Sequence, residues 1–181
     1  RSGDDAMTSR RAAIAVIGVV VLGSMAAAFA FGGYRVNFTP SYAYGLWRIE
    51  PLDREVRVGD RIFICPPPGA AAELALERGY LPRGLCPSGS GPLIKTVVAL
   101  SGQTVEVDGQ VIIDGTPLPH SAVLEADAEG RAMPVHGGGT VETGALFVHS
   151  DFVGSYDSRY FGPLPAEGTL GLAREVFTFA P

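Results

Sequence analysis

A lysine and a serine in this sequence could together carry out nucleophilic catalysis. Lys95, in "GPLIKTVVAL", is the only lysine among the 14 lysine and arginine residues. Arginine keeps its charge, whereas a buried lysine can lose its proton. The apolar residues around Lys95 predict a place in a sheet, where desolvation lowers the pKa of the ammonium group. A neutral amine can act as a general base. The alternative is a lysine on an edge strand that faces solvent and guards against aggregation.

Ser41, in "NFTPSYAYGLWRI", is the candidate nucleophile. A serine hydroxyl needs a base to remove its proton, and Ser–Lys pairs achieve this without histidine. Pro40 stiffens the approach to Ser41, and Gly45 permits a close backbone turn. Thr39 would lie on the same face as Ser41 in an extended segment and could donate to an oxyanion. The alternatives are a turn or strand start, and a chance glycosylation sequon at Asn37-Phe38-Thr39.

A third polar stretch, "SDFVGSYDSRYFGP", covers residues 150–163. Ser155, Asp157, Ser158 and Arg159 put four polar groups within five residues of an otherwise apolar region. Asp157 and Arg159 could form a buried salt bridge, and Ser155 could orient an amine by a hydrogen bond. The alternative is a polar loop between strands.

The two cysteines, Cys65 and Cys86, lie 21 positions apart. In an exported domain such a pair predicts a disulfide, worth about 3 kcal/mol in the chain-entropy model. The alternatives are two free buried thiols or half of a metal site. None of the histidines has ligand spacing with either cysteine, so neither a metal nor another cofactor is expected. His149, beside the third polar stretch, is expected to be a surface or strand residue.

The elements that must position these residues are mostly strands. Short runs of β-branched and aromatic residues are bounded by Gly, Pro and Asp, and Asp108-Gly109 indicates a hairpin. A helix is predicted in "GAAAELALERGY", between the cysteines, ending at Gly79. Residues 116–144 are predicted to be a flexible excursion from the sheet. We therefore expect one mostly antiparallel β domain over residues 34–181.

The amino-terminal region has the composition of a membrane segment. Residues 12–31 carry no charge, and such a helix would span about 30 Å, the thickness of a bilayer core. Arg10 and Arg11 precede it, which predicts a cytoplasmic tail at residues 1–11, a transmembrane anchor at 12–33 and an exported domain. A cleaved signal peptide is the alternative, since Ala28-Phe29-Ala30 has the small-x-small pattern. The length of the apolar run favours the anchor.

The charge and hydropathy of the chain indicate which kinds of partner it can bind. The net charge is −5 and no basic cluster occurs beyond the Arg10-Arg11 pair, which argues against nucleic-acid binding. The mean hydropathy of +0.22 is high for a purely soluble chain. Trp47 follows closely after the apolar segment and could lie at the membrane interface, with a core position as the alternative.

The three polar stretches resemble, in order, successive boxes of the type I signal peptidase family. They are most similar to its conjugative-transfer branch, the TraF-like peptidases that mature pilins. "GDRIFI" at residues 59–64 resembles the intervening Gly-Asp box of the family, and the similarity covers residues 34–181. The resemblance implies a mainly β fold: a partly open antiparallel barrel with one N-terminal transmembrane helix and one or two short helices.

The resemblance also implies roles for the site residues. Ser41 would be the nucleophile and Lys95 the general base, with Thr39 and the Ser41 backbone N–H stabilising the oxyanion. Ser155 would position the lysine amine. The ion pair of Asp157 and Arg159, with Ser158 between them, would support the site.

One position departs from the pattern of this branch, which usually has Ser-x-Pro-x-Gly. Residue 43 is Ala here, so the nucleophile turn lacks one rigid residue. This affects the expectation for fine substrate preference and leaves the expected chemistry unchanged.

The expected function is that of a membrane-anchored serine endopeptidase that processes an exported, pilin-like precursor. It would be a single-pass protein of the inner membrane with its catalytic domain in the periplasm, and its partners would be the precursor and the lipid bilayer. Some relatives cyclise their pilin, an outcome that this sequence does not determine. The alternatives are a housekeeping signal peptidase and a non-catalytic, membrane-anchored assembly protein.

Overall fold

A computed structural model describes residues 2–181, apart from the side chains of residues 2–9, 12, 26, 28 and 30. Residue 1 of the predicted tail, and the two alanine side chains of the alternative cleavage pattern (Ala28 and Ala30), therefore lie outside the described residues. The chain forms two compact units, residues 1–35 and 36–181.

The first unit consists mainly of helix α1 (Ser2–Phe31). Within the part of the chain that the structure describes, no helix has both the length and the apolar character needed to cross a bilayer. The membrane anchor expected at residues 12–33 stays a prediction.

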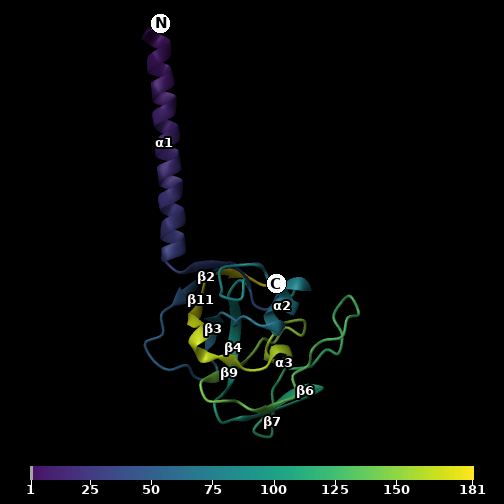
Figure 1. Cartoon of the computed structure of the whole chain (residues 1–181). Coiled ribbons are helices and arrows are strands. Elements are labelled where there is room, and N and C mark those ends of the chain that lie inside the picture. Colours follow the sequence, from purple (N-terminus) through teal and green to yellow (C-terminus); the bar gives the residue numbers. More distant parts are fainter. Residues whose placement is uncertain (1) are drawn as a thin grey trace. The chain divides into compact units, whose positions relative to one another are not determined.

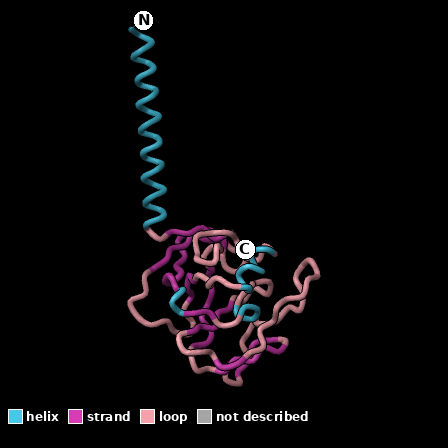
Figure 2. Tube along the Cα trace, in the orientation of Figure 1, coloured by secondary structure: helices cyan, strands magenta, loops and turns pink. Residues whose placement is uncertain are grey.

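The second unit is built mainly of β-strands with few helices (Figure 2). The larger sheet has seven strands and curls into a half-barrel, in the order β1 (Tyr34–Asn37), β2 (Tyr44–Glu50), β11 (Thr169–Phe179), β3 (Arg61–Ile64), β4 (Leu93–Leu100), β9 (Ala145–His149) and β10 (Leu164–Pro165). The smaller sheet has four strands, in the order β7 (Thr116–Pro117), β6 (Gln110–Ile113), β5 (Thr104–Asp108) and β8 (Gly139–Thr140). This is the expected mainly β, antiparallel, partly open barrel. Figure 1 shows β6 and β7 at the opposite end of the unit from β2 and β11.

Strand β11 organises the larger sheet, because it pairs with β3 through its first residues and with β2 through the rest. The β2–β11 pair needs a glycine at Gly45, where φ is +121° and an added Cβ would lie 2.3 Å from the Phe177 carbonyl oxygen. L-residues rarely adopt this φ, and no side chain fits so near the neighbouring backbone. Gly45 therefore allows the strand that follows the Ser41 turn to start close beside β11.

Among the described residues, two of the three clusters of buried apolar side chains include residues of both β3 and β4. The larger contains Ile62, Ile64, Val97 and Val148, packed with residues of α2 and α3. The other contains Trp47 with Phe63, Ile94 and Ala173. Trp47 is fully buried and its Nε1–H donates to the Ala43 carbonyl at 3.0 Å. Its expected place at a membrane interface was wrong, because the centre of β2 is covered by its neighbours, and the core alternative is correct.

The helices of the second unit are short, as expected. Helix α2 (Ala70–Glu77) lies between the cysteines, and its end at Gly79 (φ 73°) is closed by a hydrogen bond from Tyr80 N–H to the Ala75 carbonyl at 2.8 Å. Cys65 and Cys86 form the predicted disulfide around this helix. The others are α3 (Ser158–Phe161) and the 3₁₀ helix η1 (Ala166–Gly168).

Candidate active site

Ser41 lies in the turn that joins β1 to β2, and this turn folds around the side chain of Asn37. Asn37 Nδ2 donates to the carbonyls of Thr39, Tyr42 and Ala43 at 2.9, 3.0 and 3.1 Å. Its Oδ1 accepts from Thr39 N–H at 3.1 Å and from Thr39 Oγ1 at 2.7 Å. The Asn37 side chain is buried and its amide nitrogen donates to three carbonyls, so it is not free to carry a glycan. The sequence interpretation missed this structural role and noted Asn37 only as a chance sequon.

Tyr42 fastens the turn to the strands that carry the other site residues. Its hydroxyl is 2.7 Å from Thr96 Oγ1 and donates to the His149 carbonyl at 3.2 Å. Thr96 is the residue next to Lys95 on β4, and it is paired with His149 on β9. The residue after the candidate nucleophile is thus tied to the strand of the candidate base. The Arg61 guanidinium lies over the Tyr42 ring, 4.8 Å from its centroid.

Ser41, Lys95 and Ser155 are brought together by one shared hydroxyl. Lys95 is only 3% exposed, and its amine donates to Ser155 Oγ. Ser155 Oγ also accepts from Ser41 Oγ at 3.2 Å. The hydroxyl of Ser155 therefore connects the candidate nucleophile with the candidate base.

The environment of Lys95 shifts its protonation equilibrium toward the neutral form. Burial lowers the pKa of Lys95 to about 8; the carboxylate of Asp157 partly opposes this shift, and the guanidinium of Arg159 adds to it. With that pKa, about a tenth of the lysine is neutral at pH 7 and about half at pH 8. Lys95 can therefore accept a proton near neutral pH, which an arginine in its place could not do.

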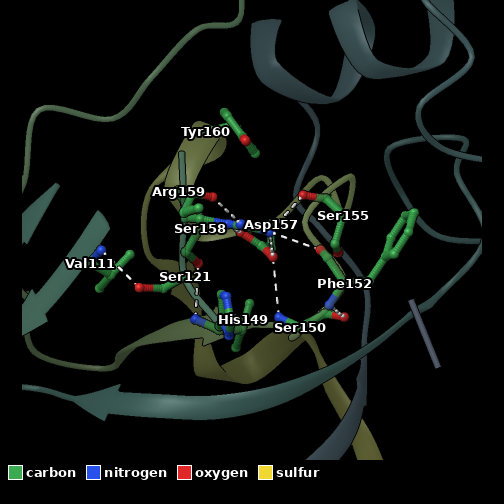
Figure 3. Close-up of polar contacts among 12 residues, drawn as sticks. Val111, Ser121, His149, Ser150, Phe152, Ser155, Asp157, Ser158, Arg159 and Tyr160 are labelled. Carbon is green, nitrogen blue, oxygen red and sulfur yellow. Dashed lines mark hydrogen bonds and ion pairs between the residues drawn. The ribbon is translucent and has the colours of Figure 1, made fainter. Parts of the chain in front are cut away.

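Asp157 and Arg159 form a completely buried, bidentate ion pair. Arg159 Nε donates to Asp157 Oδ1 at 2.8 Å, and Arg159 Nη2 donates to Asp157 Oδ2 at 2.9 Å (Figure 3). The remaining guanidinium donors bind the backbone carbonyls of Ala122, Phe152 and Ser155, at 2.6, 3.3 and 3.1 Å. Good geometry and many hydrogen bonds are what a buried ion pair needs to offset its desolvation. The pair fixes the backbone of Ser155, whose hydroxyl contacts Lys95.

Ser158 supports the same region from the first residue of α3. Its Oγ accepts from Val148 N–H at 3.0 Å, which joins α3 to β9. Asp157 precedes the helix as its N-cap, and its side chain accepts from Arg159 N–H at 3.2 Å. Residues 155–160 of this stretch are therefore buried and hydrogen-bonded, whereas residues 151–154 form an exposed loop after β9.

Two candidate residues have environments that the sequence did not predict. The Thr39 hydroxyl, expected to donate to an oxyanion, donates to Asn37 Oδ1. His149 lies in β9 as expected, but it is buried, and burial lowers its pKa. Its Nδ1 is 3.8 Å from Asp151 Oδ1, and within the described residues its Nε2 has no hydrogen-bond partner. No group of three or more His, Cys, Asp or Glu side chains in residues 2–181, as far as they are described, could hold a metal ion.

Comparison with known proteins gives consistent matches over most of the chain. A family model described as "Signal peptidase, peptidase S26" matches residues 9–178. The conjugal transfer protein TraF of Agrobacterium fabrum (strain C58) is 54% identical over 175 residues, which cover 96% of this chain and 99% of that protein. The probable conjugal transfer protein TraF of Sinorhizobium fredii (strain NGR234) is 54% identical over 168 residues, with coverages of 93% and 89%.

There are also more distant matches. A plasmid transfer protein TraF of Escherichia coli is 35% identical over 160 residues, which cover 86% of this chain and 89% of that protein. Among solved structures, a signal peptidase I from Enterococcus faecalis V583 is 21% identical with a TM-score of 0.40, covering 66% of this chain and 97% of that chain. The family model spans nearly the whole sequence, and the relatives match along most of their own length. This chain therefore belongs to the signal peptidase family, peptidase S26.

Proposed function

We propose that this protein is a membrane-anchored serine endopeptidase in which Ser41 is the nucleophile and Lys95 is the general base. The observation that carries the proposal is the hydrogen-bonded chain from Ser41 Oγ through Ser155 Oγ to the buried amine of Lys95. The protein that contains these hydrogen bonds is a member of a peptidase family. A buried amine with a pKa of about 8 is matched to proton transfer near neutral pH.

Acylation begins when neutral Lys95 takes up the proton of the Ser41 hydroxyl. Ser41 Oγ then attacks the carbonyl carbon of the scissile peptide bond, and a tetrahedral oxyanion forms. The C–N bond breaks as the Lys95 ammonium returns a proton to the leaving amine, which leaves an ester on Ser41. Water, deprotonated by Lys95, then hydrolyses the ester and restores the free hydroxyl.

The Ser41 backbone N–H and the Thr39 hydroxyl are the proposed donors to the oxyanion. Thr39 Oγ1–H donates to Asn37 Oδ1 in the substrate-free protein, so it must rotate toward the oxyanion during the reaction. Asn37 Oδ1 keeps the Thr39 N–H as a donor, so it does not lose all its partners when the hydroxyl turns. The hydrogen bond from Thr39 to the oxyanion would then form in the transition state and not in the resting enzyme.

We propose an exported precursor, specifically a conjugative pilin, as the substrate. The relatives named as conjugal or plasmid transfer proteins support a role in conjugation. The uncharged run at residues 12–31, after Arg10 and Arg11, supports a single anchor in the inner membrane with the peptidase unit in the periplasm. Ser41 follows Phe31 by ten residues, a connection of at most about 36 Å. The nucleophile would therefore act near the membrane surface, where a precursor's apolar segment ends.

The test is to co-express a candidate pilin precursor with the wild-type protein, with Lys95→Arg and with Ser41→Ala, and to measure the product mass. A mature product with the wild type alone is expected, because arginine stays charged and cannot act as the base. A mass one water below that of the linear product would mean that the substrate's own amino terminus, and not water, releases the acyl group. Equal product with all three proteins would refute the Ser41–Lys95 assignment.

The same experiment separates two other functions. A housekeeping signal peptidase would also cleave unrelated exported precursors supplied in place of the pilin. A non-catalytic assembly protein would tolerate Lys95→Arg and yield no cleaved product with any precursor. The buried contact between Lys95 and Ser155 favours the peptidase, because an amine is costly to bury and serves no need in a purely structural strand.

A further inference from the structure

A third buried serine, Ser150, contacts the backbone of the candidate nucleophile. It follows β9 directly and is only 1% exposed. Its Oγ donates to the Ser41 carbonyl at 2.7 Å and accepts from Phe152 N–H at 3.3 Å. Its backbone N–H donates to Asp157 Oδ2 at 3.2 Å (Figure 3). Ser150 therefore joins the Ser41 turn to the buried ion pair.

The ion pair of Asp157 and Arg159 then reaches both proposed reacting groups through two serines. Arg159 holds the Ser155 carbonyl, and the Ser155 hydroxyl contacts the Lys95 amine. Asp157 holds the Ser150 amide, and the Ser150 hydroxyl holds the Ser41 carbonyl. One rigid, fully buried pair thus sets the positions of the nucleophile and the base relative to each other.

A bond to the Ser41 carbonyl restricts the Ser41 side chain. The carbonyl and the side chain share one Cα, so a fixed peptide plane limits where Oγ can lie. The Asn37 side chain holds the neighbouring carbonyls of the turn, those of Thr39, Tyr42 and Ala43, but the carbonyl of Ser41 is held by Ser150. Misplacing a reacting group by about 1 Å can cost about 100-fold in rate.

We infer that Ser150 is a positioning residue for the peptidase reaction, which keeps Ser41 Oγ in reach of Ser155 and Lys95. The inference rests on the proposed function, since it assumes that Ser41 and Lys95 react. Ser150 is hydrogen-bonded to the Ser41 carbonyl and not to the Ser41 hydroxyl or the lysine amine, so it acts through the backbone. Its loss should lower kcat and leave KM and the pKa of the base nearly unchanged.

Ser121 provides a matched control for removing a buried serine hydroxyl. It is 2% exposed, its Oγ donates to the Leu118 carbonyl at 2.6 Å and accepts from Val111 N–H at 3.0 Å. Ser121→Ala therefore removes the same atoms and the same two kinds of hydrogen bond as Ser150→Ala. Neither of these two hydrogen bonds involves a proposed site residue.

The experiment compares the full-length wild type with Ser150→Ala, Ser150→Thr, Ser121→Ala and Ser41→Ala. The substrate is a synthetic peptide across the cleavage site that the mass experiment identifies. Values of kcat, KM and the pH profile of kcat/KM are measured per folded molecule, with the folded fraction taken from thermal unfolding curves. We expect Ser150→Ala to lower kcat by roughly 10- to 100-fold at constant KM and unchanged apparent pKa. Ser150→Thr keeps a hydroxyl and should recover most of the rate, and Ser121→Ala should keep the wild-type kcat.

The outcomes separate this inference from the proposed function. If Ser41→Ala is inactive but Ser150→Ala has a kcat within twofold of the wild type, the inference is wrong and the proposed function stands. An equal loss of kcat per folded molecule in Ser150→Ala and Ser121→Ala would also overturn it, because the effect would then not be specific to the site. If Ser41→Ala retains wild-type activity, the proposed function fails and the inference fails with it.

Discussion

Replacing Lys95 by methionine is expected to abolish activity and, at the same time, to make the protein more stable at pH 7. Methionine keeps an unbranched chain of similar length in the apolar strand β4 but carries no charge. The lysine amine is buried, and its desolvation, which lowers the pKa of Lys95, outweighs the attraction of Asp157. The wild-type fold is therefore less stable with the Lys95 amine protonated than it would be with the amine neutral.

The size of the gain follows from the same pKa. The pKa of Lys95 falls from 10.5 to about 8, and one pKa unit corresponds to about 1.4 kcal/mol, so the burial of the charged form costs roughly 3 kcal/mol at pH 7. Methionine also loses the hydrogen bond to Ser155, which is worth about 1 kcal/mol. We expect a net gain of about 2 kcal/mol, or an increase in Tm of roughly 4–8 °C for a chain of this size.

The pH dependence has a definite sign. The folded-state pKa lies below the unfolded one, so the cost is absent above pH 10.5, grows as the pH falls toward about 8, and is nearly constant below it. The part of the gain that comes from burying the charge should therefore be full at pH 7 and fall to less than half by pH 9.5. Thermal and urea unfolding of the full-length protein in detergent, followed by circular dichroism at both pH values, measures this difference.

Ser41→Ala is the control, because it is expected to be equally inactive but keeps the buried lysine. It should lie within about 0.5 kcal/mol of the wild type. If Lys95→Met is less stable than the wild type at pH 7, Lys95 is not a desolvated group and the argument for a neutral base is lost. A gain of the same size at pH 7 and pH 9.5 would mean that packing, and not the charge, is responsible.

Three further predictions concern the base, the ion pair and the disulfide. The kcat/KM of the wild type should rise about tenfold per pH unit up to about pH 8 and then level off, because only neutral Lys95 accepts a proton; a profile that is flat from pH 6 to 9 would contradict this. Asp157→Asn leaves the buried Arg159 guanidinium without its counter-charge, so the free energy of unfolding measured with urea should fall by about 3–5 kcal/mol. A fall of less than about 1 kcal/mol would show that the ion pair contributes little to the stability of the fold. Replacing both Cys65 and Cys86 by serine should cost about 3 kcal/mol, and only the wild type should lose thermal stability when reductant is added.

The sequence was sufficient to indicate that three polar residues of the candidate site lie in apolar surroundings. A single lysine within an apolar strand and an Asp-Ser-Arg run among apolar residues both stand out, and the structure buries Lys95, Asp157 and Arg159. The disulfide and the helix between its cysteines were also predicted from local pattern. The roles of Ser41, Lys95 and Thr39 stay predictions, and the experiments above test them.

Residues that act through side-chain hydrogen bonds to backbone carbonyls were not predicted. Asn37 and Ser150 are ordinary polar residues in sequence, one before a proline-containing turn and the other at a strand end. Their importance comes from contacts with carbonyls, and every residue carries a carbonyl, so no side-chain pattern signals them. Trp47 was misassigned for a related reason: its distance from the apolar segment is visible in sequence, but the strands that cover it are not.

The sequence by itself determined the strand pattern, the cysteine pair, the apolar amino-terminal segment and the types of group available for chemistry, because these depend on local composition and spacing. Only the tertiary structure decided that Ser41 and Lys95 meet at the hydroxyl of Ser155, 114 and 60 residues away from them in the chain. The physical reason is sheet topology. Strand β4 lies beside β9, which ends at the segment carrying Ser155, and the hydrogen bonds of Tyr42 and Ser150 draw the Ser41 turn to the same end of these strands.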